Sequence, residues 1–185
     1  MNRDPLLEKA MRRTEGRVHA TTGWGTPPII FSIRRAEDGT YTYRPVPLPA
    51  DFWDRFDGPS SDGLAALAAT MTRPGAGVGG KSIASAVPED LFGWAFMTEA
   101  YQYVVAPGEN PSGEPAVDFP AESIRALSTM TVTNVSAVLV RSEVSNEVDI
   151  TWWTFADTRS TTLDAFGTDP AVATSLHRLC QLARA

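Results

Sequence analysis

The sequence has little of the residues that would build a cross-linked or metal-stabilised fold. Cys180 is its single cysteine, so a disulfide within the chain is excluded. Only His19 and His177 accompany it, which is too few ligands for a structural zinc site. We therefore expect a fold that depends on packing alone, with no metal and no cofactor.

Long apolar runs are missing as well. No segment reaches the roughly 18 apolar residues that a membrane-spanning helix needs. The first residues, MNRDPLLEKAMRRTEG, place charges where a signal peptide has its apolar stretch. These absences predict a cytoplasmic protein with no membrane partner.

Positive charge is in short supply. The chain has 16 basic against 22 acidic residues and a formal net charge of -6. Because proteins that follow a phosphate backbone concentrate Lys and Arg, we expect no nucleic-acid partner. The exception is the first 17 residues, in which five basic residues outnumber three acidic ones. The basic ones are Arg3, Lys9, Arg12, Arg13 and Arg17.

What the sequence does have is an ordinary globular balance. Its 185 residues are 43% hydrophobic and 21% charged, which fits one domain over residues 1–185. In the first half, Asp4-Pro5 predicts the start of a helix that ends near Gly16, followed by a connector over residues 19–28. The segments IIFSIRR and TYTYRPV predict a β-hairpin, and the Ala- and Leu-rich run at 62–71 predicts a helix.

The second half carries further strand signals. Aromatic and β-branched residues favour a strand over 92–105, although its length would also suit a helix. Residues 120–128 read as a short helix, and Asp169-Pro170 predicts a terminal helix with Leu176 on its apolar stripe.

The segments TVTNVSAVLVRSE and VDITWWTFAD predict a second hairpin around a two-residue turn at Ser145-Asn146. That register pairs Val140 with Thr151. Apolar residues then occur on both faces of the hairpin, so both faces need cover. One face carries Val138, Val140, Trp153 and Phe155, and the other carries Val135, Ala137, Leu139 and Trp152. We therefore predict an α+β fold, a mainly antiparallel sheet built from hairpins with the N- and C-terminal helices packed on it.

One motif suggests chemistry. GAGVGGKS, from Gly75 to Ser82, matches the phosphate-binding pattern G-x-x-x-x-G-K-[ST], in which Gly80, Lys81 and Ser82 would contact phosphate and magnesium. Asp157 follows a predicted strand and could supply a magnesium-holding carboxylate. A true loop of this kind joins a buried strand to a helix, whereas the upstream segment here reads as helix and Pro74 removes a backbone donor. The context argues against the motif.

The aromatic residues suggest a different function. Trp152 and Trp153 must point to opposite sides of one strand, and such residues either fill a core or anchor a partner. We expect core, with one of the two faces as the alternative partner or self-association surface. The leading hypothesis is a non-enzymatic interaction or accessory protein; the alternative is a nucleotide-binding protein or enzyme that uses the Gly75–Ser82 loop.

Overall fold

The fold is an antiparallel sheet between helices, seen in a computed structural model that describes residues 3–71, 77–78, 81–82, 90–103, 121–154 and 170–182. The helices are α1 (Pro5–Thr22), α2 (Ser60–Met71) and α3 (Pro170–Leu182), with a short 3-10 turn η1 (Trp53–Arg55). The strands are β1 (Ile29–Arg35), β2 (Tyr41–Pro45), β3 (Gly77–Val78), β4 (Lys81–Ser82), β5 (Leu91–Tyr103), β6 (Ala121–Thr131), β7 (Val135–Ser142) and β8 (Val148–Thr154).

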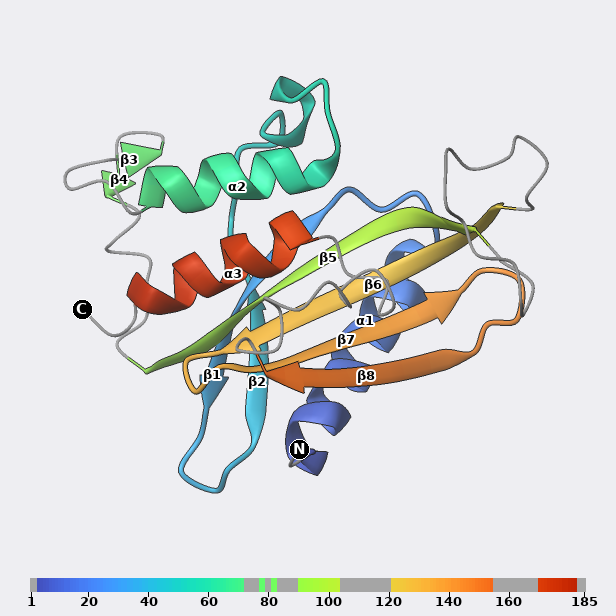
Figure 1. The fold of residues 1–185 in the computed structure, drawn as a ribbon, viewed down its shortest axis with the longest axis horizontal. Helices are drawn as coiled ribbons and strands as arrows, with labels where there is room; N and C mark the ends of the chain where they lie inside the picture. The colour runs from blue at the N-terminus through green and yellow to red at the C-terminus, as the bar shows by residue number, and fades with distance from the viewer. Residues whose placement is uncertain are drawn as a thin grey trace.

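Six strands form the main sheet in the order β2-β1-β5-β6-β7-β8, all antiparallel. Figure 1 shows α1 on one face of this sheet and α2 and α3 on the other. The predicted α+β fold, with terminal helices packed on a sheet of hairpins, is confirmed. None of the helices in these ranges has the length and apolar character that crossing a bilayer requires.

Strand alternation divides the core between the two faces. Toward α2 and α3, the buried side chains include Trp94, Phe96 and Met130 from the sheet and Leu176 from α3. Toward α1, they include Met11 of the helix and the sheet residues of a second apolar cluster. The sheet residues that are buried there are Phe31, Ile33, Ala95, Met97, Leu127, Ala137, Leu139 and Trp152.

The end of the first helix differs from expectation. The first helix does not end near Gly16 but continues to Thr22, where Gly23 stops it with a φ of 63° and donates its N–H to the His19 carbonyl. A glycine inside a helix costs only about 1 kcal/mol relative to alanine, and buried Glu15 and half-buried Val18 hold this helix on the sheet around it. The first residues of the predicted connector are therefore helical.

The predicted helix at 120–128 is wrong, because this segment is strand β6. Its Ala, Leu and Arg are good helix formers, but it pairs with β5 from Gly93↔Thr131 to Tyr103↔Ala121 and with β7 on its other side. Tertiary pairing thus overrides local propensity.

The second hairpin exists with a different register. Val140 pairs with Asp149 rather than Thr151, because Ser142 closes on Glu147 and residues 143–146 form the loop. Asn146 adopts a φ of 58° there, and Ser142 Oγ accepts the Ser145 N–H at 2.9 Å. A register shift of two residues leaves every side chain on the same face of the sheet. The predicted assignment of the hairpin's apolar residues to two faces therefore holds.

Candidate functional site

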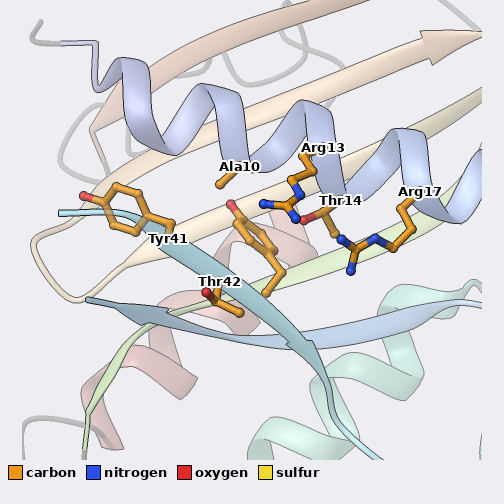
Figure 2. A pocket seen from close by; sticks show the side chains of 7 residues that line it. Ala10, Arg13, Thr14, Arg17, Tyr41 and Thr42 are labelled. Carbon is orange, nitrogen blue, oxygen red and sulfur yellow. The ribbon is translucent and has the colours of Figure 1, made fainter. Parts of the chain in front are cut away.

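A pocket of about 160 Å³ lies between α1 and the edge strand β2. Figure 2 shows Arg13, Thr14 and Arg17 directed from the helix toward the strand. Of the described residues that line it, none is acidic. The lining consists of Ala10, Arg13, Thr14 and Arg17 from α1 and Tyr41, Thr42 and Tyr43 from β2.

The two arginines of this pocket have no charge partner among the described residues. Arg13 and Arg17 are exposed and four residues apart, so they lie one helical turn from each other on the same side of α1. Neither side chain has a hydrogen bond or ion pair to any residue that the structure describes. Arg12, their neighbour, instead donates to Glu8 Oε1 at 3.1 Å and to the Val148 carbonyl at 3.2 Å. The pocket therefore holds two cations whose charge the described fold does not neutralise.

The strand side of the pocket is polar but neutral. The Tyr41 hydroxyl donates to Asp4 Oδ2 at 2.6 Å, and the Tyr43 hydroxyl lies 3.1 Å from Thr129 Oγ1. Burial together with the bond to Asp4 raises the pKa of Tyr41 to about 12, and burial raises the pKa of Tyr43 as well. Both phenols stay protonated at neutral pH, so the arginines set the charge of the pocket.

A buried ionic network fixes the helix that carries these arginines. Glu15 is fully buried beneath α1, and its carboxylate accepts two hydrogen bonds from Arg141, at 2.7 and 2.6 Å. Because successive helical residues are about 100° apart, positions 13 and 17 lie roughly opposite Glu15 around the helix. With Glu15 anchored to the sheet, Arg13 and Arg17 lie outside the core, where they line the pocket beside β2.

Arg125 joins this network to the strand next to it. It is fully buried, lies 3.7 Å from Glu15 Oε1, and donates to Glu99 Oε1 at 2.6 Å. Its guanidinium lies 4.9 Å from the centre of the Trp24 ring and donates to the Gly23 carbonyl. One buried side chain therefore contacts α1, the segment that follows it and strand β5.

Glu99 completes the attachment of that segment. Its carboxylate accepts the backbone N–H groups of Gly25 at 2.8 Å and Thr26 at 3.3 Å. Burial alone would raise the pKa of Glu99, but the hydrogen bonds from Arg125 and from these two N–H groups lower it below its ordinary value of 4.5. The C-terminal end of α1 is held by ion pairs and hydrogen bonds in addition to apolar contact.

The end of the phosphate-loop motif lies in a strand, whereas in a phosphate-binding loop it opens a helix. Lys81 and Ser82 form strand β4, which pairs with β3 through Val78↔Lys81 and Gly77↔Ser82. In a phosphate loop these two residues open a helix. The element upstream is α2, a helix, as expected. Gly75, Gly80 and Asp157 lie outside the described residues, so nucleotide binding stays a prediction.

The remaining candidates lie in the core or beyond the described residues. Trp152 is 6% exposed and packs in the cluster beneath α1, opposite Ala137. Trp153 belongs to β8, and its side chain is not among those described. Cys180 is buried, with Sγ 3.3 Å from the Met130 carbonyl oxygen. Among the described residues, no three His, Cys, Asp or Glu side chains gather as a metal site would require.

The sequence did not predict the pocket lined by Arg13 and Arg17, nor the buried ionic network around Arg125. The basic excess near the N-terminus included Arg13 and Arg17, but only the fold places them beside β2. Arg125 was assigned to a helix, and no local pattern connects it with Glu99, which is 26 residues away. Comparison with known proteins found no matching family model, no matching curated protein and no matching solved structure.

Proposed function

We propose that this chain is a non-enzymatic interaction protein that recognises carboxylate groups of a protein partner at the pocket between α1 and β2. The observation that supports the proposal is the pair Arg13 and Arg17, which line one pocket without a charge partner among the described residues. By contrast, Arg12 pairs with Glu8, Arg141 pairs with the buried Glu15, and Arg125 pairs with Glu99 and lies 3.7 Å from Glu15. Because Arg13 and Arg17 have no such partner in the described part of the chain, their charges are free to bind a ligand.

The chemistry of the guanidinium group favours carboxylates as ligands. Its planar fork of N–H donors matches the two oxygens of a carboxylate, and such charge-assisted bonds are stronger than neutral ones. The acidic remainder of the chain, with a net charge of -6 overall, disfavours an extended phosphate backbone. A local pair of arginines instead suits a partner that presents a few carboxylates at defined positions.

The proposal is tested with two labelled peptides, one in which Glu and Thr alternate and one in which Lys and Thr alternate. Fluorescence anisotropy should show binding of the acidic peptide only, weakening as salt is added because the charges are exposed. The double variant Arg13→Gln/Arg17→Gln should weaken binding about tenfold or more.

The control is Arg55→Gln/Arg178→Gln, which removes the same formal charge from two exposed arginines, Arg55 of η1, which pairs with Asp51, and Arg178 of α3. It should leave the affinity within about twofold. Equal loss in both double variants would show that net charge, not the pocket, attracts the peptide, and would overturn the proposal. Absence of binding by the acidic peptide would do the same.

A further inference from the structure

The outer edge of β2 carries backbone groups that the sheet does not use. In an antiparallel pair, residues alternate between those that exchange hydrogen bonds with the neighbour and those that face away from it. The Ala36 N–H donates to the Thr40 carbonyl and the Val46 N–H to the Ile30 carbonyl, both at 2.9 Å. These two bonds show that the even-numbered residues of β2 are the ones that exchange hydrogen bonds with β1.

Thr42 and Arg44 therefore bond to β1, opposite Arg34 and Ser32. Tyr41 and Tyr43 present their N–H and C=O groups to the other side. No strand among the described residues pairs with β2 there. An exposed edge of this kind is a template for an additional strand.

The spacing of the edge matches the spacing of the free arginines. Tyr41 and Tyr43 have their side chains on the α1 side of the sheet, where they border the apolar cluster beneath that helix. A strand paired with β2 would place the residues opposite them on the same side, about 6.8 Å apart. Arg13 and Arg17 are about 6 Å apart along the axis of α1. Two carboxylates at alternate positions of such a strand would face two guanidiniums.

We infer that the partner is an extended acidic peptide segment that adds to the edge of β2, with Glu or Asp at alternate positions opposite Tyr41 and Tyr43. This inference rests on the proposed function and specifies its partner and its mode of binding. The peptide runs antiparallel to β2, so its acidic residues exchange backbone hydrogen bonds with Tyr41 and Tyr43, and its alternate carboxylates bond to Arg13 and Arg17. Peptides with the sequence pattern Glu-Xaa-Glu are therefore preferred.

A second copy of the chain is a poorer occupant of this edge. Pairing β2 with β2 of another copy would bring two sets of Arg13, Arg17 and Arg44 together. All three are exposed, and none has a side-chain partner among the described residues. Like charges at such short range oppose association, whereas an acidic strand neutralises them.

Backbone hydrogen exchange, followed by NMR, tests the mode of binding on the intact protein. In the free protein, the N–H groups of Tyr41 and Tyr43 should exchange rapidly, while those of Thr42 and Arg44 are protected by β1. The peptide in which Glu and Thr alternate should slow exchange at Tyr41 and Tyr43 about tenfold or more and leave the two control residues unchanged. Binding without this protection would overturn the inference and leave the proposed function standing.

Two modified peptides make the test independent of the protein's folding. N-methylation of the Glu residues removes the N–H groups that would bond to the tyrosine carbonyls, and should weaken binding about tenfold or more. N-methylation of the Thr residues removes outward-facing groups and should be tolerated. Equal effects of the two modifications would exclude strand addition.

A third peptide tests the spacing. Its Glu residues are grouped in adjacent pairs, at the same total charge, and it should bind several-fold more weakly than the alternating peptide. Equal affinity would overturn the preference for alternate carboxylates. Protection of Tyr41 and Tyr43 that rises with protein concentration, without peptide, would assign the edge to a second copy instead.

Discussion

The two faces of the main sheet are covered in physically different ways. The face toward α2 and α3 is packed with apolar side chains, among them Trp94, Leu64 and Leu176. The face toward α1 has an apolar cluster and, beside it, the buried charges of Glu15 and Arg125. Apolar packing is non-directional, whereas ion pairs and hydrogen bonds fix orientation. The difference explains how α1 can be held at one angle around its axis, as a pocket lined by Arg13 and Arg17 requires.

The largest expected loss of stability comes from the ionic network on the α1 face. Arg125→Met leaves Glu15 and Glu99 without one of their cations in a buried site, and we expect a loss of about 3–5 kcal/mol in the free energy of unfolding. Urea denaturation measures it. Arg178→Met, at an exposed position of α3, should change the same quantity by less than about 0.5 kcal/mol.

A small effect of Arg125→Met would mean that apolar contact and the Arg141–Glu15 pair hold α1 without Arg125, and the contrast between the faces would be weaker. The double variant Arg125→Met/Glu99→Gln sharpens the result. It should recover part of the loss, because the carboxylate left behind no longer carries a charge.

The apolar face is tested by Leu176→Ala. Leu176 is buried between α3 and the sheet, so truncation should cost about 2–5 kcal/mol through lost burial and the remaining cavity. Thr174→Ala, at an exposed position of the same helix, is the control and should be nearly neutral. An unchanged urea midpoint for Leu176→Ala would show that α3 is not part of the packed core.

Local patterns predicted most of the helices and strands, and missed those that depend on distant neighbours. The first hairpin, the strand at 92–105 and the helices α2 and α3 were predicted because apolar periodicity and capping residues are local signals. Strand β6 was missed, since its residues favour a helix and its conformation depends on two neighbouring strands. Ile124, Arg125, Ala126 and Leu127 are all buried in the strand, so no alternation of apolar and polar residues marks it in the sequence.

The site was less predictable than the fold for a related reason. Arg125 is satisfied by Glu99 and Glu15, and the pocket combines α1 with β2, so both depend on contacts between distant parts of the chain. The second hairpin shows the limit even within a local motif. The polar side chain of Ser142 and the conformation of Asn146 shape its loop, and the register moved by two residues.

The charged network also predicts a dependence on pH. The pKa of Glu99 is lowered in the folded protein, so this group stabilises the fold above its unfolded pKa, and that contribution is lost as the pH falls through the folded value. Between about pH 7 and about pH 3, the wild type should therefore lose more stability than Glu99→Gln. Urea denaturation at both pH values measures the difference. Parallel losses in the two proteins would place the acid-sensitive groups elsewhere.

The smallest effect concerns the other end of α1. Asp4 caps the helix by accepting the N–H groups of Leu6 at 3.0 Å and Leu7 at 3.2 Å, and it also accepts the Tyr41 hydroxyl. Asp4→Ala should cost about 1 kcal/mol, the usual value of a capping residue, because these groups can turn to water at a partly exposed helix start.

Asp57→Ala, which removes an exposed carboxylate with no partner among the described residues, is the matched control and should be neutral. Comparing Asp4→Ala with Arg125→Met then shows which end of α1 fixes the helix. If the network under its C-terminal half dominates, Asp4→Ala also leaves peptide binding by Arg13 and Arg17 unchanged. A loss from Asp4→Ala as large as that from Arg125→Met, with weakened peptide binding, would instead assign the orientation of the arginines to the N-terminal cap and its bond to Tyr41.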